Sequence, residues 1–347
     1  MKTSGFGYRL PDELIAQSPV EPRDSARLLR ASDLTDWTVR DLPELLRPGD
    51  LVVVNDTRVR AARLIGRREP TGGRVELLLL GHQGGRWRAL ARPARRLRAG
   101  SEVRAGPLVA CIETDPEEGQ VDLTLRTASG GAGDEVVERA IAETGLVPLP
   151  PYIHRVLDDP ERYQTVFADR VGSAAAPTAG LHLTARTLDD LAKRGISVAR
   201  IELRIGLDTF RPITTEEIED HRMHSEWIEV PEATVDRMEE TCRSGGRVVA
   251  VGTTVVRALE TACRNGRPAP YRGSTSLYIM PGHRFGAVDL LLTNFHMPGS
   301  SLLVLVAAFV GESWRSVYKT ARKRGYRFLS FGDAMLLERA PTPVGSR

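Results

Sequence analysis

Short segments between residues 61 and 150 alternate apolar and polar side chains. Gly-Gly, Pro and Asp-Pro turn signals separate these segments, as expected when each one forms a half-buried strand. The segments are Arg74–Leu80, Arg86–Ala91, Leu108–Ile112 and Gln120–Arg126. Several short strands at this spacing predict an antiparallel barrel or sandwich of roughly 90 residues.

Outside this region, short apolar strands alternate with helices. The run Leu51–Val54 predicts a buried strand. Beyond residue 150, further strands are expected at Ser197–Ile205, Arg247–Val251, Ser276–Met280 and Val288–Leu292. Helices are expected at Ala185–Arg194 with Thr184 as N-cap, Thr234–Cys242, Val255–Cys263, from Ser300 or Ser301 onward, and at Trp314–Lys323. This alternation favours a mostly parallel sheet covered by helices. We therefore predict an α/β domain of residues 1–60 and 151–347, interrupted by an inserted antiparallel β-barrel domain of residues 61–150.

Composition places the chain among ordinary globular proteins, because 41% of its residues are apolar and 27% are charged. The apolar stretch Leu302–Val310 is too short to cross a bilayer, which takes about 20 residues, so a buried helix is expected there. The polar segment Met1–Gln17 does not resemble a signal peptide. Cys111, Cys242 and Cys263 are odd in number and far apart, which favours a reducing cytoplasm and a packing role. A cytoplasmic location is expected.

Charge is unevenly distributed over the expected barrel. Residues 60–104 contain twelve arginines and three glutamates, whereas residues 105–150 contain two arginines and nine acidic residues. A basic block of this kind is typical of proteins that bind a polyanion. The alternative is a solvated arginine-rich surface, and the acidic half leaves both interpretations open.

The segment 247–260 (RVVAVGTTVVRALE) predicts a strand, a glycine turn and a helix. The first N–H groups of such a helix can bind a carboxylate or phosphate, with Thr253 and Thr254 beside it. Arg257 near the first turn opposes the helix dipole, which a bound anion would offset. A simple capped turn is the alternative. Neither a Gly-x-Gly-x-x-Gly motif nor a phosphate-binding P-loop is present, which disfavours Rossmann-type and P-loop enzymes.

Other candidates lie where strands end or where histidines cluster. Asp56 and Arg58 follow the strand Leu51–Val54, either as ligand-binding residues or as an internal ion pair. His182 follows a run of small residues, AAAPTAGL, and has either a proton-transfer or a structural role. Asn294 and His296 lie between a buried strand and a buried helix, so they need hydrogen-bond partners from protein or ligand.

The segment Asp220–Glu226 (DHRMHSE) places two histidines and two carboxylates within seven residues. The spacing of His221 and His224 could suit a metal, but no His-Glu-x-x-His pattern or nearby cysteine completes a ligand set. We therefore predict no metal site. General acid–base chemistry by His224 and Glu226 is the better interpretation.

Seven segments, by their sequences and their order along the chain, together resemble one family, S-adenosylmethionine:tRNA ribosyltransferase-isomerase of queuosine biosynthesis. The segments are NDTRV, YQTVF, AAPTAGLH, EDHRMHSE, VGTTVVRALE, LLTNFHMP and FGDAM, and the similarity runs from Leu10 to about Leu337. The resemblance implies an α/β domain with an inserted six-stranded barrel. It also implies transfer of the ribosyl group of S-adenosylmethionine to 7-aminomethyl-7-deazaguanine in the tRNA wobble position. Epoxyqueuosine forms, and adenine and methionine leave.

The partners implied are a tRNA with a queuosine-type anticodon loop and S-adenosylmethionine as co-substrate, with no other cofactor, no metal and no membrane. In this chemistry a base removes a ribosyl C5′ proton, adenine leaves protonated, and the methionine carboxylate needs a cation or a helix N-terminus. We assign Glu226 or His224 as the base and His182 as the acid. The substrate-binding residues we expect are Thr253, Thr254 and Arg257 at the carboxylate, with Asp56, Arg58, Asn294 and His296 in the pocket.

Three positions depart from the pattern of the resembled family. Arg204 replaces a histidine, Asp208 a glycine, and Gly286 a lysine. Two other functions therefore stay open: a diverged relative that transfers ribosyl to a small-molecule amine or free deazapurine, and a non-catalytic RNA-binding relative. Adenine release with and without tRNA separates all three.

Overall fold

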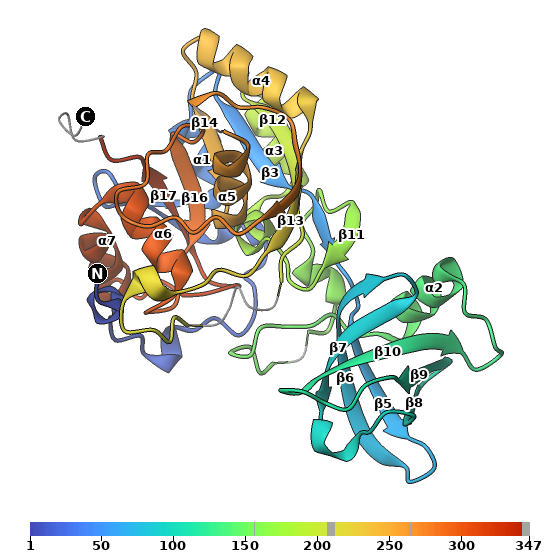
Figure 1. Ribbon diagram of the computed structural model, residues 1–347. Helices are drawn as coiled ribbons and strands as arrows, with labels where there is room; N and C mark the ends of the chain where they lie inside the picture. The colour runs from blue at the N-terminus through green and yellow to red at the C-terminus, as the bar shows by residue number, and fades with distance from the viewer. Residues whose placement is uncertain (156, 207–211, 264–265, 342–347) are drawn as a thin grey trace. The chain divides into compact units, whose positions relative to one another are not determined.

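The structure, a computed structural model, describes residues 1–155, 157–206, 212–263 and 266–341. The chain forms two compact units (Figure 1). The first unit contains Met1–Arg58, Pro150–Arg170 and Ala176–Arg347, and the second contains Val59–Leu149 and Val171–Ala175. The limits expected from the sequence, at residues 60 and 150, lie close to these, whereas the short segment Val171–Ala175 was not expected in the second unit.

The first unit is built on a nine-stranded sheet of order β15-β13-β12-β3-β14-β16-β17-β1-β2 (Figure 1). Its strands are β1 Arg27–Arg30, β2 Thr35–Thr38, β3 Leu51–Asn55, β12 Ser197–Leu203, β13 Glu226–Val230, β14 Val248–Val251, β15 Tyr271–Thr275, β16 Leu290–Asn294 and β17 Ala334–Glu338. The four central strands β12, β3, β14 and β16 are parallel, and the flanking strands add antiparallel pairs. Every residue of β3 and β14 is buried, as in parallel strands covered on both faces. The predicted α/β class is confirmed.

Helices cover this sheet. They are α1 Leu42–Leu45, α3 Ala185–Lys193, α4 Glu232–Arg243, α5 Thr253–Ala262, α6 Ser301–Val310 and α7 Ser313–Lys323. Helix α5 packs on the four central strands. Helix α3 begins with the predicted cap, since Thr184 Oγ1 accepts a hydrogen bond from Thr187 N (3.1 Å). Helix α6 is mostly buried, as predicted.

Single turns of 3₁₀ helix connect these elements. They are η1 Thr3–Phe6, η2 Asp12–Leu14, η3 Arg23–Ser25, η4 Val39–Asp41, η5 Ala94–Arg96, η6 Pro160–Tyr163, η7 Thr178–His182 and η9 Ile218–Asp220. Within the described residues, no single helix is long and apolar enough to cross a membrane. The consecutive helices α6 and α7, bent by 116°, meet the criteria of length and composition only as a pair.

The second unit is a closed six-stranded antiparallel barrel of order β10-β7-β6-β5-β8-β9, which confirms the predicted barrel. Its strands are β5 Arg63–Arg68, β6 Gly73–Gln83, β7 Arg86–Arg92, β8 Glu102–Ala105, β9 Leu108–Ile112 and β10 Gln120–Thr127. The alternating apolar side chains pack together in its core, among them Leu77, Trp87 and Leu123. Helix α2 (Asp134–Thr144) packs on β9 and β10. Two further strands, β4 Thr57–Val59 and β11 Arg170–Ser173, pair with each other.

One predicted strand was wrong. Ser276–Met280 has no regular secondary structure, and the strand is the preceding segment β15, which pairs with β13 as the edge of the sheet. Edge strands do not need a buried apolar pattern, so the polar sequence YRGST gave no signal. The apolar residues that follow instead lie beside α5, where Leu277 O accepts a hydrogen bond from Arg257 Nε (3.0 Å).

Candidate functional site

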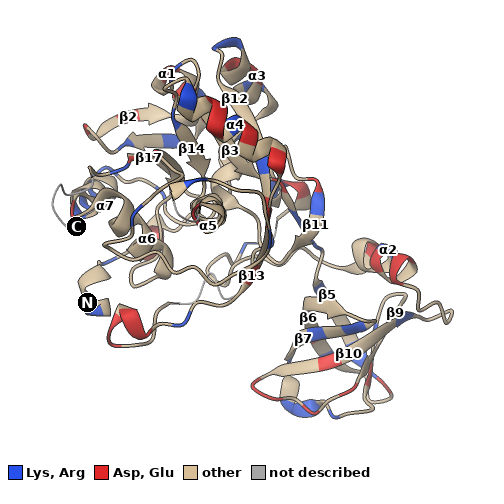
Figure 2. Cartoon of the chain, turned by 45° about the horizontal axis from the view of Figure 1, so that its top comes forward, with Lys and Arg blue, Asp and Glu red and all other residues tan. Residues whose placement is uncertain are grey.

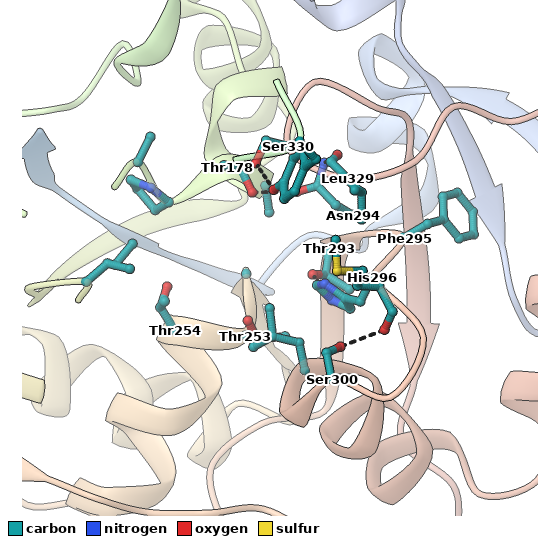
Figure 3. A pocket seen from close by; sticks show the side chains of 18 residues that line it. Thr178, Thr253, Thr254, Thr293, Asn294, Phe295, His296, Ser300, Leu329 and Ser330 are labelled. Atoms are coloured by element: carbon teal, nitrogen blue, oxygen red, sulfur yellow. Dashed lines mark hydrogen bonds between the residues drawn. The ribbon is translucent and has the colours of Figure 1, made fainter. Parts of the chain in front are cut away.

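A pocket with an empty volume of about 680 Å³, here named the main pocket, lies at the carboxyl ends of the parallel strands in the first unit. Ile205 follows β12, Gly252 follows β14, and Asn294 ends β16, so three strands direct their ends toward it. Ligands of open α/β sheets bind at this edge. The other lining residues are Tyr152, Ala176, Pro177, Thr178, Ala179, Thr253, Thr254, Thr293, Phe295, His296, Met297, Ser300, Leu302, Leu329 and Ser330 (Figure 3).

Two helices begin at the pocket. Helix α5 starts at Thr253 after Gly252, whose φ of 94° and ψ of 153° are tolerated by glycine and few other residues. Helix α6 starts behind Ser300, whose Oγ accepts a hydrogen bond from Leu303 N (3.2 Å). Thr254 is buried, and its Oγ1 has no hydrogen-bond partner within the described residues. Figure 3 shows Thr253 and Thr254 at one helix start and Ser300 at the other. Helix N-termini favour anions, so this part of the pocket suits a carboxylate.

The opposite wall is polar but uncharged. Asn294 Oδ1 accepts a hydrogen bond from Thr178 Oγ1 (3.0 Å), and its Nδ2 donates to Leu329 O (3.1 Å). The hydroxyl groups of Tyr152 and Ser330 lie 2.7 Å apart. The lining residues, all in the described part of the chain, include no Asp, Glu, Lys or Arg. Such a wall suits a neutral heterocycle recognised through hydrogen bonds.

His296 adds a neutral imidazole to this wall. Its Nε2 lies 3.1 Å from Thr293 Oγ1, and its backbone N–H donates to the Tyr318 hydroxyl (3.0 Å). Burial lowers the pKa of His296 to about 3, so the ring is neutral near pH 7. The structure thus brings four residues expected from the sequence to one pocket: Thr253, Thr254, Asn294 and His296.

Glu226 and Arg257, both buried, form a separate cluster with the partly buried His224, and this cluster does not line the pocket. Arg257 donates to Glu226 Oε2, His224 Nε2 lies 3.2 Å from Glu226 Oε1, and Gly206 N donates to the same oxygen (3.1 Å). Burial by itself raises the pKa of Glu226, but the hydrogen bond from His224 and the charge of Arg257 outweigh it, so the pKa lies below its usual value. Glu226 is therefore held as an ion-paired carboxylate, which makes it a weak base.

His182 lines another, smaller cavity of about 270 Å³, together with Arg23 and Arg162. Its Nδ1 lies 3.1 Å from Ala179 O and its Nε2 lies 2.9 Å from Gly332 O. Burial lowers the pKa of His182, although both carbonyls oppose this shift. The ring connects η7 to the loop before β17, and the structure does not bring it to the main pocket.

Asp56 and Arg58 also lie outside the lining of the main pocket. Arg58 forms an ion pair with Glu161, and Asp56 Oδ2 lies 3.9 Å from Arg170 Nε. Both residues therefore contact other segments, and the internal Asp56–Arg58 pair that the sequence left open is not seen among the described ion pairs.

The three departures from the family pattern have different surroundings. Arg204 stacks over the Trp227 ring at 4.1 Å and donates to Glu202 (2.7 Å). Gly286 N donates to Glu260 (3.0 Å), and a Cβ at Gly286 would lie 2.9 Å from Cys263 Sγ, so a lysine there would require a shift. Asp208 lies outside the described residues.

Sequence reasoning missed several lining residues. Thr178 belongs to the segment AAPTAGLH, and Ser330 directly precedes FGDAM, so the motifs were noticed but not these side chains. Tyr152 follows two prolines and carries no recognisable signal. No group of three or more His, Cys, Asp or Glu arranged to hold a metal ion occurs among the residues described.

Both acidic and basic residues occur on the barrel (Figure 2). Five arginines of the basic block form ion pairs: Arg60 with Glu138, Arg63 with Glu76, Arg86 with Glu113, Arg88 with Asp122 and Arg104 with Glu69. Arg95, Arg96 and Arg98, at and after η5, are exposed and have no acidic partner in the described part of the chain. Arg67, Arg74 and Arg92 are likewise exposed with no ion pair among the described residues, so both groups are candidate polyanion contacts. Arg95, Arg96 and Arg98 are the group that lies closest together along the chain.

Comparisons with known proteins agree over nearly the whole chain. Residues 3–337 match a family described as queuosine biosynthesis protein. A protein of Symbiobacterium thermophilum, named S-adenosylmethionine:tRNA ribosyltransferase-isomerase, is 48% identical over 97% of this chain and 100% of its own. One of Anaeromyxobacter with the same name is 49% identical over 98% and 100%. The crystal structure of a Thermotoga maritima S-adenosylmethionine tRNA ribosyltransferase is 37% identical, covers 95% of this chain and 99% of its own, and has a TM-score of 0.54.

Proposed function

The chain belongs to the queuosine biosynthesis protein family of S-adenosylmethionine:tRNA ribosyltransferase-isomerases, and from this premise we propose the reaction that it catalyses. The ribosyl group of S-adenosylmethionine is transferred and isomerised onto 7-aminomethyl-7-deazaguanine in the wobble position of a tRNA with a queuosine-type anticodon loop. The products are epoxyqueuosine-tRNA, adenine and methionine. S-adenosylmethionine is a co-substrate, and the reaction itself calls for no further cofactor.

The observation that carries the proposal is the pocket with a helix N-terminus on one side and an uncharged polar wall on the other. The methionine carboxylate of the donor fits the start of α5, where Thr253 and Thr254 lie and Thr254 Oγ1 lacks a partner among described residues. Adenine, a neutral heterocycle, fits the wall that contains Asn294 and the neutral His296. Both groups belong to one molecule, and one pocket offers both environments.

The chemistry requires a base for a ribosyl C5′ proton, which the neighbouring sulfonium acidifies. Of the two residues predicted for this step, Glu226 already accepts three contacts and has a lowered pKa. We therefore assign the base to His224, whose Nε2 is held by Glu226. His224 does not line the main pocket either, but it lies beside Gly206, which directly follows the pocket residue Ile205. Arg257 supports this carboxylate rather than the donor. His182 as the acid toward adenine finds no support in its position, since it lines the smaller cavity.

Adenine release tests the proposal. Wild-type protein with S-adenosylmethionine should release adenine, detected by chromatography, when tRNA carrying 7-aminomethyl-7-deazaguanine is added, and not with the same tRNA carrying guanine. Release with the free aminomethyl-deazapurine in place of tRNA would favour the small-molecule function. No release under any condition would favour a non-catalytic RNA-binding protein. A cytoplasmic location stays a prediction.

A further inference from the structure

Three carboxylates lie in a row on one face of the sheet. Ile201 of β12 pairs with Asn55 of β3, so the next residues, Glu202 and Asp56, are neighbours, and Asp56 N donates to Ile201 O (2.9 Å). Glu202 in turn pairs with Glu229 of β13. Residues opposite each other in register point to the same face. Like charges placed directly opposite destabilise a sheet, so this acidic row of Asp56, Glu202 and Glu229 requires cations.

Arg170 lies within 4 Å of all three carboxylates of the acidic row, but it is closer to Glu202 and Glu229 than to Asp56. Its Nη1 lies 3.4 Å from Glu202 and 3.3 Å from Glu229, and Glu202 also binds Arg204 Nε (2.7 Å). Asp56 is left with Arg170 Nε at 3.9 Å, which is longer than a hydrogen bond.

Asp56 is therefore the incompletely paired member of the row. Its side chain is only 6% exposed, yet Oδ1 has no hydrogen-bond partner among the described residues. A buried carboxylate oxygen without a partner is costly, because burial removes the water that would otherwise solvate it. The unpaired oxygen therefore indicates that a ligand supplies the missing cationic group.

Asp56 lies at the same edge of the sheet as the main pocket. Strand β3 lies between β12 and β14, and the residues after those two strands, Ile205 and Gly252, line the pocket. Asp56 directly follows β3 and so lies at the same edge of the sheet. The pocket lining, within the described chain, contains no carboxylate, although the proposed substrates carry cationic groups.

We propose that Asp56 is the binding site for a primary ammonium group of a substrate. This assignment rests on the proposed function, which supplies two such groups: the α-ammonium of S-adenosylmethionine and the aminomethyl group of the acceptor base. A charge-assisted hydrogen bond from N–H to Oδ1 would satisfy the orphan oxygen. With the acceptor, the same contact provides a proton exit: the N–H bond breaks, the proton joins the carboxylate, and the neutral amine keeps the lone pair for attack.

Titration of Asp56 gives this site a pH dependence. Burial raises the pKa of Asp56 to about 6; Glu202 and Asp169 act in the same direction, whereas Arg170 and Arg200 oppose it. Below this pH the carboxyl is protonated and no longer attracts an ammonium group. Both ammonium groups stay mainly charged between about pH 5 and 7.5, since α-amino groups titrate near pH 8 and alkylamines near pH 10. The preference for an ammonium ligand should therefore disappear on acidification.

Two matched ligand pairs test the assignment by equilibrium binding at about pH 7.5, well above the Asp56 pKa. The first pair is S-adenosylmethionine and its analogue without the α-amino group. The second is tRNA carrying 7-aminomethyl- or 7-methyl-7-deazaguanine. Wild type should prefer the ammonium member of one pair by roughly 10–100-fold, the range of a charge-assisted bond. Asp56→Asn should reduce that preference to within about threefold, while Asp169→Asn, an exposed neighbouring carboxylate, should retain it.

The pair that loses its preference identifies which ammonium group Asp56 binds. If Asp56→Asn retains both preferences, the assignment is overturned. Should Asp56→Asn fail to fold, wild type decides: its preference should fall between about pH 7.5 and 5, and a constant preference would overturn the assignment. The proposed function fails separately, through absent adenine release by wild type, and binding of the donor pair still reports on Asp56 in that case.

Discussion

Arg257 and Glu226 lie in one buried ion pair, although the sequence suggested that they act on different parts of the substrate. Each side chain is at least nine-tenths buried, so each charge depends on the other for compensation. His224, less buried, contacts the same carboxylate. The three residues predicted for catalysis and binding thus contact one another through Glu226. In our proposal His224 contacts the substrate, and the Glu226–Arg257 ion pair holds His224 in place.

Glu226→Gln should therefore reduce both turnover and stability, not turnover alone. Loss of the carboxylate leaves Arg257 buried without its partner, which we expect to lower the free energy of unfolding by about 3–5 kcal/mol. Adenine release and chemical denaturation measure the two effects. Glu226→Gln combined with Arg257→Met should regain stability without regaining turnover. A single variant with normal stability and normal release would show that Glu226 has neither role.

At the scale of elements, two strand–turn–helix units build the anion-binding side of the pocket. In the first, β14 leads through Gly252 into α5, and in the second, β16 leads through a longer turn into α6. Gly252 adopts a backbone conformation that is almost restricted to glycine, and this allows α5 to begin directly at the pocket. The N–H groups of the first turn are positioned by the backbone, so the turn rather than any one side chain determines the site.

Gly252→Ala should shift the start of α5. The added Cβ would make only ordinary contacts, 3.6 Å to Ala179 and to Thr254, so backbone strain is the expected cause of any loss. We expect about 1–3 kcal/mol lower stability and, because the N–H groups move, affinity for S-adenosylmethionine reduced by about tenfold. Thermal unfolding and titration calorimetry give the two values.

Gly245→Ala is the matched control. Gly245 also has a positive φ of 75°, with nothing within 4 Å of an added Cβ, and it lies in the turn after α4. It should lose stability through the same kind of strain and keep its affinity. Unchanged affinity in Gly252→Ala would show that the donor does not bind at the start of α5.

On the scale of the whole molecule, charge separates two kinds of surface. The main pocket lining is uncharged, whereas the barrel has many charges, and five arginines of its basic block form ion pairs. Arginines of the basic half, residues 60–104, form ion pairs with acidic residues of the barrel. For these paired arginines, a solvated surface is the better interpretation than polyanion binding. The exposed group Arg95, Arg96 and Arg98 is different, because it has no acidic partner within the described residues.

Replacing Arg95, Arg96 and Arg98 by Ala should weaken tRNA binding and flatten its salt dependence. Each lost phosphate contact removes about 0.7–0.9 from the slope of log affinity against log salt, so three contacts remove about 2–3. The KM for tRNA should rise and that for S-adenosylmethionine should stay constant. The control replaces the exposed but paired Arg86, Arg88 and Arg104. Equal slopes for wild type and the first variant would make the basic block a solvated face.

The sequence by itself determined the local elements and part of the pocket. Period-two alternation identified strands such as β10, Gln120–Thr127, and Thr184 marked the start of α3. Thr253, Thr254, Asn294 and His296 were found because each follows or ends a buried strand, and parallel strands bring their carboxyl ends to one edge. The sequence did not predict edge strand β15 or the pocket position of Tyr152, since neither requires an apolar pattern.

Only the tertiary structure decided how the charged residues are used. Glu226 and Arg257 are 31 positions apart, and Asp56 meets Arg170 from a distant segment. Periodicity reports on neighbours two to four residues away, whereas an ion pair depends on distance in space and on competition among all nearby partners. Arg170 shows the reason: with three carboxylates around one guanidinium, the geometry alone determines that Asp56 is the one left incompletely paired.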